Sequence, residues 1–354
     1  MKLFKGLFTG SLAGLVMAGC ASAPDYEIAE VSAVTETAPM PNRGDAADDP
    51  AIWVHPGDSA RSRILGTNKD QGLYVYDLEG EILQELLIGQ INNVDLRRSA
   101  GLETEGFDLA VASNDSVNAV SLFSIRRTDG EVAHIGDIET GKVEPYGICM
   151  GTPGGDTLVG ITYKDGTVQI MRLAMREGAI SAGLFRIEAV ASQPEGCVFD
   201  EAHDALYVGE EARGIWRLDL ADESSGFRAV DMVSSRRGLS VDVEGLTIWR
   251  GAEGEGWLVA SSQGRSQFVV YDRAPPNAWR GVFRVVEAPG KPDLDAVSHT
   301  DGLDATSAAL PGYDRGLLVV QDDGNPRPEV DQNFKLLDWA DVEAALSLPE
   351  IAAE

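Results

Sequence analysis

The chain has 354 residues, of which 44% are hydrophobic and 24% are charged, a composition typical of a globular protein rather than of a disordered one. Its formal net charge is −28. Such an acidic chain lacks the basic surface that nucleic-acid-binding proteins use, so we exclude nucleic acid as a partner and favour a bound cation or a cationic substrate.

The first predicted element is an export signal at residues 1–19. Lys2 and Lys5 give it a basic start, and a mostly apolar, small-residue stretch follows at 7–19. A segment of this length is too short to span a bilayer comfortably and is typical of a secretory signal.

The signal ends in VMAGC, which resembles the lipobox of bacterial lipoproteins, with Cys20 as the lipidated first residue of the mature chain. An ordinary signal cut near 21–23 is the alternative. Ala21 resembles the residue type that allows transfer to the outer membrane. We therefore predict an exported protein that is lipid-anchored to the outer membrane.

Residues 20–44 are rich in Ala, Thr, Pro and Glu and show no periodicity, which predicts a flexible tether between the lipid and the folded domain. From Asp45 onward, short alternating apolar runs are separated by Gly, Asp and Asn turns, which indicates β-structure. Helical periodicity is convincing only near 339–346. The predicted folded domain spans 45–345.

The apolar runs repeat at intervals of 45 to 66 residues. One type of run recurs as LYVYD, VSLFS, VQIMR, GIWRL, FVVYD and FKLLD, ending at or near Tyr76, Phe123, Met171, Trp216, Tyr271 and Leu337. Six units of several short strands predict an all-β, six-bladed β-propeller. A β-sandwich would not repeat at this period, and a parallel α/β fold would need helices between its strands.

Polar residues recur at the start of the first strand of each unit. In a propeller these strands line the central channel, so their starts converge on one face. The residues concerned are Asp48, Asp49, Asn92, Asn93, Asp95, Glu144, Tyr146, Glu195, Asp242, Glu244, Asp301 and Asp304. The ends of the second strands add Lys69, Lys164, Glu210, Glu211, Gln263 and Asp322.

So many carboxylates in one place predict a metal site, because like charges at short range are unfavourable unless a cation lies between them. Oxygen donors with few His or Cys residues favour Ca²⁺, ahead of Mg²⁺ or Mn²⁺. The four His residues form no metal-spaced pair, which argues against zinc. Lys69 and Lys164 beside such a cluster would suit a phosphate group.

Cys149 and Cys197 each lie in an apolar, strand-like run, YGICM and EGCVF. Export would permit a disulfide, but burial in separate runs favours two free, buried thiols. Neither has a His nearby in the sequence, which argues against a catalytic thiol.

A series of motifs resembles the β-propeller phytases. They are DAADDPAIWVHP, TNKDQGLYVYDLEG, NNVDLR, PYGI, QPEGCVFDE, VDVEGLTIW, SSQGRSQFVVYDR, TDGLDAT and DQNFKLLDW, in order over about 45–340. The resemblance implies a six-bladed propeller that hydrolyses phosphomonoesters of myo-inositol hexakisphosphate (phytate) and needs several Ca²⁺ ions for stability and catalysis. Phytate or its calcium complex would be the substrate, and the protein would act as a monomer.

The resemblance also assigns roles to individual residues. Asp49, with backbone carbonyls near Pro50 and Val94, would hold a structural calcium, and Asp295 and Asp322 would serve a second stabilising site. The catalytic calcium cluster would be lined by Tyr146, Glu195, Glu211, Asp242, Glu244, Gln263 and Asp301. Lys69, Tyr146 and Lys164 would hold the phosphate, and the catalytic set would be Lys69, Tyr146, Lys164, Glu195 and Glu244.

One position departs from the family pattern. The family usually has an Arg after ASN, where this chain has Asp115 in ASNDS. Another cation could take that role, with Arg97, Arg213 and Arg265 as candidates, or phosphate affinity could be reduced. A calcium-dependent lactonase or phosphotriesterase and a non-catalytic propeller that binds an anionic ligand are the alternative functions, and Asp115 is the best support for the second.

Overall fold

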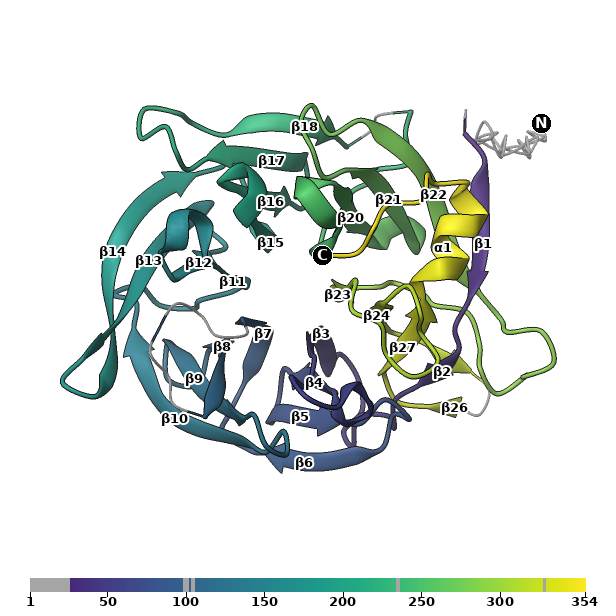
Figure 1. Ribbon diagram of the computed structural model, residues 1–354, viewed down its shortest axis with the longest axis horizontal. Helices are drawn as coiled ribbons and strands as arrows, with labels where there is room; N and C mark the ends of the chain where they lie inside the picture. Colours follow the sequence, from purple (N-terminus) through teal and green to yellow (C-terminus); the bar gives the residue numbers. More distant parts are fainter. Residues whose placement is uncertain (1–25, 98–101, 103–105, 234–235, 327–328) are drawn as a thin grey trace, which may run out of the picture.

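The computed structural model describes residues 26–97, 102, 106–233, 236–326 and 329–354. The predicted signal segment and Cys20 lie outside this range. The described residues form six sheets of four or five strands, arranged as blades around a central channel (Figure 1). The prediction of an all-β, six-bladed propeller is confirmed.

Each blade begins with an inner strand beside the channel. The inner strands of blades 1 to 6 are β3 (Ala47–Trp53), β7 (Ile91–Arg97), β11 (Ile148–Gly151), β15 (Pro194–Asp200), β19 (Leu246–Arg250) and β23 (Leu303–Thr306). The second strands, antiparallel to them, are β4 (Arg63–Asn68), β8 (Phe107–Asn114), β12 (Leu158–Thr162), β16 (Ala205–Glu210), β20 (Gly256–Ser262) and β24 (Leu317–Asp322).

The third strands are β5 (Gly72–Tyr76), β9 (Ala119–Arg126), β13 (Thr167–Arg176), β17 (Gly214–Asp219), β21 (Gln267–Asp272) and β27 (Asn333–Asp338). The fourth are β6 (Ile82–Leu86), β10 (Val132–Glu139), β14 (Ala179–Ala189), β18 (Arg228–Met232) and β22 (Trp279–Val286). Short elements in the loops are η1 (Ser59–Arg61), η2 (Pro153–Gly155), η3 (Glu201–His203), η4 (Ala252–Gly254), η5 (Gln263–Arg265), β25 (Asn325–Pro326) and β26 (Glu329–Val330).

Inner strands start, and second strands end, at the same end of the channel. We call this end the upper mouth, and the end where the inner strands finish the lower mouth. This antiparallel arrangement brings together polar residues that lie far apart in the sequence, which is the convergence that the repeat pattern predicts.

The ring is closed by strands from the N-terminal part of the chain. β2 (Thr35–Glu36) pairs with β27 and completes blade 6, while β1 (Ile28–Ser32) pairs in parallel with β22 and adds a fifth strand to blade 5. The prediction of a flexible tether over 20–44 is therefore wrong for these two strands. Their sequences carry little apolar periodicity, since an outer-edge strand is held mainly by backbone hydrogen bonds to its neighbour.

The hydrophobic core is divided among the junctions between blades. Six clusters of buried side chains lie one at each junction, because the blades face one another along their flat sides and leave the channel between their inner edges. At the junction of blades 5 and 6, Trp249 and Trp339 are both fully buried and stack with ring centroids 5.8 Å apart.

The predicted C-terminal helix is confirmed as α1 (Trp339–Leu346), whose first turn is capped by the Asp338 carboxylate at 3.0 Å from the Ala340 amide nitrogen. The chain then runs to the lower mouth, where the Glu354 N–H donates to the Arg250 carbonyl oxygen at 3.2 Å. Figure 1 shows the C-terminus near the channel. In the described part of the chain, no helix has the length and apolar character needed to cross a membrane.

The prediction of two free thiols is wrong. Cys149 on β11 and Cys197 on β15 form a disulfide, with their Cα atoms 5.6 Å apart. The two residues are 48 positions apart, about one repeat, so the propeller places them side by side on neighbouring inner strands. Two separate apolar runs gave no sign of this proximity.

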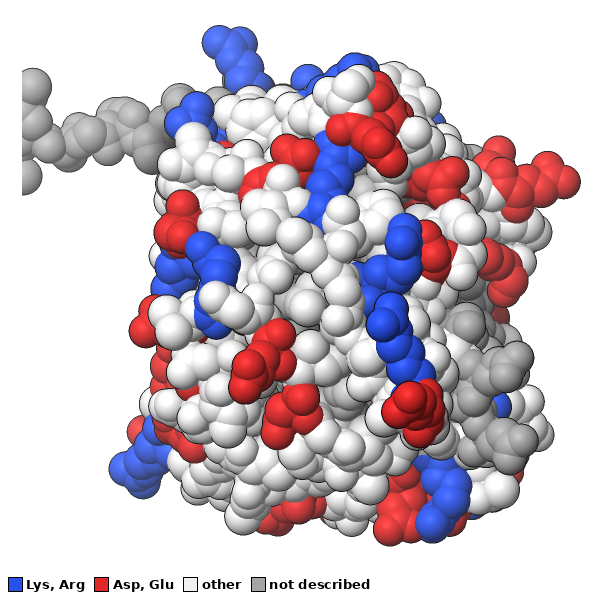
Figure 2. All heavy atoms as spheres, turned by 90° about the vertical axis from the view of Figure 1, so that its left-hand side faces the viewer, with Lys and Arg blue, Asp and Glu red and all other residues white. Residues whose placement is uncertain are grey.

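The large negative charge is not gathered on every face. On the side formed by β13 and β14, acidic and basic side chains are interspersed among uncharged ones (Figure 2). A concentration of carboxylates lies instead at the upper mouth.

Candidate functional site

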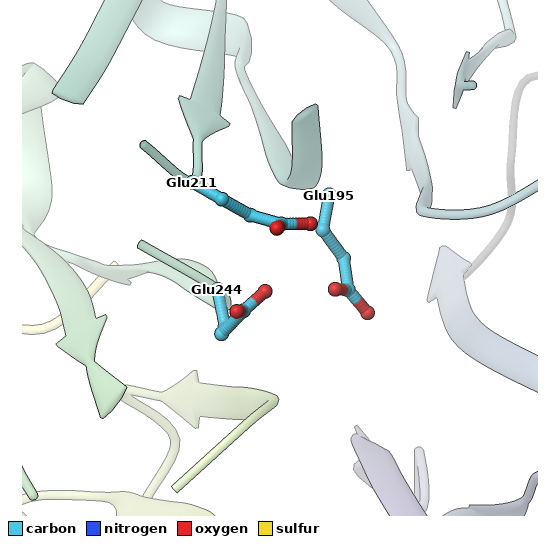
Figure 3. A group of neighbouring side chains, drawn as sticks. All are labelled: Glu195, Glu211 and Glu244. Carbon is cyan, nitrogen blue, oxygen red and sulfur yellow. The ribbon is translucent and has the colours of Figure 1, made fainter. Parts of the chain in front are cut away.

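Three glutamates form a cluster at the upper mouth. Glu195 lies at the start of β15, Glu211 directly follows β16, and Glu244 lies just before β19. One carboxylate oxygen from each lies within 4.8 Å of the other two, and Figure 3 shows the three side chains converging. Glu195 and Glu244 are only 5% and 7% exposed, so their charges are poorly screened by water.

Burial and repulsion from neighbouring carboxylates raise the pKa values of Glu211, Glu244 and nearby Asp301. Burial is the main cause of the raised pKa of Glu244, and the charges of Glu195 and Glu211 add to it. Burial and then Glu195 raise the pKa of Glu211 to about 7. Burial also raises the pKa of nearby Asp301 to about 6. A cation between these groups would reverse the repulsion and favour their ionised forms.

Glycines that follow the site residues set the spacing of the inner strands. Glycine comes directly after Tyr146, Glu195, Glu244 and Asp301. A Cβ atom at Gly196 would lie only 1.9 Å from the Glu244 carbonyl oxygen, to which the Gly196 N–H donates at 3.0 Å. A larger residue would push the two strands apart, and the carboxylates of Glu195 and Glu244 with them.

Three non-glycine residues near the site have left-handed backbone. They are Glu144, Asp242 and His299, with φ of 56°, 58° and 41°. They lie two residues before Tyr146, Glu244 and Asp301, respectively, each of which lies just before an inner strand. Such strain of about 1–3 kcal/mol per residue is often found at functional sites. Asp242 also lies near enough to the cluster for its charge to raise the pKa of Glu211.

Lys69 is held by carboxylates on the opposite side of the mouth. Its Nζ lies 2.9 Å from Asp45 Oδ1, 3.2 Å from Asp301 Oδ2 and 3.5 Å from Asp48 Oδ1. Burial alone would lower the pKa of Lys69, but Asp48 and Asp301 raise it above its ordinary value. The ammonium group is therefore charged at any physiological pH.

Lys164 and Tyr146 form a second polar group at the mouth. Lys164 Nζ lies 4.5 Å from the centroid of the Tyr146 ring, a cation–π contact. Burial, followed by the charge of Glu195, raises the pKa of Tyr146 well above its usual range. The phenol therefore keeps its proton and can donate a hydrogen bond.

Six of the residues predicted for the catalytic calcium and phosphate site line one pocket of about 330 Å³. It is lined by Lys69, Tyr146, Glu195, Glu244, Gln263 and Asp301, together with Asp45, His299 and Asp323. Gln263 Nε2 donates to Asp301 Oδ1. Asp45, His299 and Asp323 were not among the predicted site residues. His299 and Asp323 nevertheless lie within two positions of a predicted ligand.

Comparison with known proteins identifies the family. The sequence model of the family described as Phytase matches residues 4–351. The 3-phytase of Bacillus subtilis (strain 168) is 34% identical over 362 residues, covering 97% of this chain and 94% of that protein. The chain belongs to the phytase family.

Solved structures with a similar shape are more distant. A functionally unknown protein from Desulfotomaculum acetoxidans DSM 771 is 15% identical, with a TM-score of 0.48 over 69% of this chain and 73% of that one. The β-propeller domain of Myceliophteria thermophila Cps50 (Swd1) is 11% identical, with a TM-score of 0.46 over 82% and 83%. At these scores neither structure bears on the function of this phytase.

The residues expected to hold a structural calcium lie deeper in the channel. Asp49, Pro50 and Val94 line the same small space, with Asn93 and Asp95. Asp49 Oδ2 accepts the Val94 N–H at 3.1 Å, and burial raises the pKa of Asp49. The structure thus brings Asp49, Pro50 and Val94 together, in a space separate from the pocket at the upper mouth.

Asp295 and Asp322 surround a lysine of the same chain. Lys335 is fully buried, and its Nζ lies 2.7 Å from Asp295 Oδ1 and 3.2 Å from Asp322 Oδ2, beside a further contact with Glu36. Their role as calcium ligands stays a prediction, since an ammonium group already lies between them. A charged residue inside the apolar run NFKLLD was the available signal for Lys335.

The three arginines considered as replacements for the family's phosphate-binding Arg each contact another side chain of the protein. Arg97 lies at the lower mouth, paired with Asp95 at 2.9 Å and Glu201 at 3.1 Å, so its candidacy is wrong. Arg213 and Arg265 follow second strands at the upper mouth. Arg213 lies 3.7 Å from Glu210, and Arg265 donates to the Tyr26 hydroxyl at 3.1 Å.

Proposed function

We propose that this protein is a calcium-dependent phytase that hydrolyses phosphomonoesters of phytate to lower inositol phosphates and free phosphate. The observation that carries the proposal is the cluster of Glu195, Glu211 and Glu244 at the channel mouth of a phytase-family chain, near enough to Lys69 and Lys164 for their charges to interact. Such a site needs an added cation and suits a phosphate group.

The residues present fit calcium. Glu244 Oε2 and both carboxylate oxygens of Asp48 are buried without a hydrogen-bond partner among the described residues, and the donors are all oxygens, as calcium prefers. The residues that would hold it are Tyr146, Glu195, Glu211, Asp242, Glu244, Gln263 and Asp301. When bound, calcium supplies positive charge for phosphate oxygens and the Lewis acidity that activates water.

The protein's own groups bind and orient the phosphate. Lys69 and Lys164 present ammonium groups to its oxygens, and Tyr146 can donate a hydrogen bond because its raised pKa keeps the phenol protonated. Glu195 and Glu244 hold the metal side of the site, opposite Lys69. We propose water, rather than a side chain, as the nucleophile.

An acidic protein and an acidic substrate would repel each other. Calcium binds both, so we propose that phytate reaches the site as its calcium complex. This proposal is supported by the net charge of −28 and by the carboxylates around the pocket.

We further propose that the protein acts as a monomer anchored to the outer membrane through a lipid on Cys20. The VMAGC sequence supports the anchor. Replacement of Cys20 by Ser should move the protein from the membrane fraction to the soluble fraction. Retention in the membrane would contradict lipidation at Cys20.

The central test measures phosphate release from phytate by protein freed of calcium, before and after calcium is restored. We expect activity only with calcium, and equal activity in both states would exclude the metal mechanism. A lactone and a phosphotriester serve as comparison substrates, and inorganic phosphate should compete with phytate. Retention of phytate without phosphate release would indicate a binding propeller instead.

A further inference from the structure

The disulfide lies directly beneath the proposed calcium site. Cys149 is three residues beyond Tyr146, and Cys197 is two residues beyond Glu195. The bond joins inner strands of different blades, β11 of blade 3 and β15 of blade 4. It is enclosed in the hydrophobic cluster of that junction, with Cys149 fully buried and Cys197 7% exposed.

Three other junctions are held at this level by a direct backbone hydrogen bond between inner strands. The Gly196 N–H donates to the Glu244 carbonyl at 3.0 Å, and the Gly245 N–H to the Asp301 carbonyl at 3.2 Å. The Gly302 N–H donates to the Asp48 carbonyl at 3.0 Å. Each bond fixes one site carboxylate relative to the next around the ring.

The junction of blades 3 and 4 is built differently, like that of blades 2 and 3, where the Asn93 N–H donates to Ser113 Oγ at 3.0 Å and this hydroxyl donates to the Tyr146 carbonyl at 2.6 Å. The Gly147 N–H donates to Thr162 Oγ1 at 2.9 Å, and this hydroxyl donates to the Glu195 carbonyl at 3.0 Å. A hydroxyl therefore replaces the direct bond between the strands. Nevertheless the strands are close, because a Cβ atom at Gly147 would lie 2.0 Å from the Glu195 carbonyl oxygen.

We propose that the Cys149–Cys197 disulfide is a positioning element of the calcium site. It holds β11 and β15 together where the direct backbone bond is replaced. It therefore keeps Glu195, whose strand is already bonded to that of Glu244, in register with Tyr146 across the junction. The inference rests on the proposed calcium-dependent function, and it assigns the disulfide to metal affinity rather than to stability alone.

The test compares calcium binding by wild-type protein and two variants without the cross-link. Cys149→Ala/Cys197→Ala removes both sulfurs, and Cys149→Val/Cys197→Ala restores apolar volume at the same place. We expect calorimetry to show calcium affinity about 10-fold weaker in both variants, at the low end of the effect of groups that orient metal ligands. With saturating calcium, kcat should return close to the wild-type value.

Val269→Ala is the matched control, since Val269 is a fully buried residue on the third strand of blade 5, away from the cross-link. It should lower the melting temperature while leaving calcium affinity unchanged. Wild-type calcium affinity in the folded double variants, or an equal loss of affinity in Val269→Ala, would overturn the inference.

Wild-type protein measured before and after reduction gives the same comparison without substitution. Reduction should weaken calcium binding, and reoxidation should restore it. The outcome is separable from that of the proposed function: wild-type protein that binds calcium but releases no phosphate would refute the phytase activity alone. A calcium affinity that is the same with and without the disulfide would refute the positioning role alone.

Discussion

The two mouths of the channel use partly buried carboxylates in opposite ways. At the lower mouth, Glu201 lies 3.1 Å from Arg97 and 3.4 Å from Arg250. Burial alone would raise the pKa of Glu201, but Arg250 and Arg97 together lower it to about 2. At the upper mouth, burial and neighbouring carboxylates raise the pKa of Glu211 to about 7.

The difference shows that the upper mouth is not acidic merely because the chain is acidic. At their lower ends, inner strands such as β7 and β19 supply arginines. These arginines balance the charge of Glu201 within the protein. At the upper ends of the inner strands the carboxylates outnumber Lys69 and Lys164, and some buried carboxylate oxygens have no hydrogen-bond partner in the part of the chain that the structure describes. Buried charge left uncompensated is costly, and its persistence points to a cation from outside the chain.

Removal of one carboxylate at each mouth should separate the two roles most strongly. Glu244→Gln removes a proposed metal ligand, and we expect phosphate release at limiting calcium to fall by about 100-fold. Glu201→Gln breaks a largely buried ion-pair network, so we expect a loss of about 2–3 kcal/mol in the free energy of unfolding with activity kept. Phosphate-release assays and urea denaturation measure the two effects.

The comparison of the mouths would fail if both variants lost activity equally, or if Glu244→Gln retained wild-type calcium dependence. Calorimetry on Glu244→Gln provides an independent reading. Its calcium affinity should fall, while that of Glu201→Gln should match the wild type.

The next largest effect on activity should come from Lys69 at the upper mouth. Lys69→Ala removes an ammonium group that faces Asp45, Asp48 and Asp301, and we expect kcat/KM for phytate to fall by about 100-fold because charge on the phosphate is no longer stabilised. Lys69→Arg keeps the charge and should retain more activity. An unchanged rate in Lys69→Ala would remove this residue from the site.

The sequence predicted the fold and most of the pocket because both follow from periodicity. Strand-forming runs recur six times, and Glu195, Glu244 and Asp301 occupy the same phase of successive repeats. A propeller turns equal phase into equal position around the channel. Glu211 and Gln263 followed from the same reasoning applied to the second strands.

Features that depend on pairing between distant segments could not be predicted in this way. The partner of Cys149 is fixed by the contact between blades 3 and 4, and the edge strand β1 is fixed by its backbone bonds to β22. Lys335 is stabilised in the core by carboxylates from three other segments and by the side-chain oxygen of Asn325 at 2.7 Å. No local pattern reports these contacts, since each arises when the ring closes.

The pH dependence of stability should differ between the mouths. The pKa of Glu211 rises from 4.5 to about 7 and that of Asp301 from 3.8 to about 6. At a pH between the ordinary and the raised pKa of each group, the folded state holds a proton that the unfolded state has released. The free energy of unfolding of calcium-free protein should therefore fall as pH rises from about 4 to 7. Calcium favours the ionised forms and should remove this loss.

Glu201 contributes with the opposite sign. Its pKa falls from 4.5 to about 2, so its stabilisation is complete above pH 4.5 and is lost as pH falls toward 2. Thermal unfolding of calcium-free protein from pH 4 to 7.5 tests the upper mouth, and Glu201→Gln tests the lower one below pH 4.5. A melting temperature that rises between pH 4.5 and 7 without calcium would contradict the assignment for the upper mouth.

The smallest expected effect concerns Asp115, where an acid faces the phosphate side of the upper mouth. Its Oδ1 is buried with no hydrogen-bond partner among the described residues. Burial raises the pKa of Asp115, while the nearby charge of Lys164 lowers it. The carboxylate therefore competes with phosphate for Lys164. Asp115→Arg should lower the KM for phytate by about 3- to 10-fold, on the order of 1 kcal/mol, with little change in kcat.

Asp115→Asn separates the two parts of this effect. It removes the competing charge without adding a cation, so its KM should lie between those of the wild type and Asp115→Arg. The gain should shrink as ionic strength rises, because Asp115 is only partly buried and salt screens its charge. A KM that rises in Asp115→Arg would mean that this carboxylate helps to hold calcium, and the acid would then belong with the metal side of the mouth.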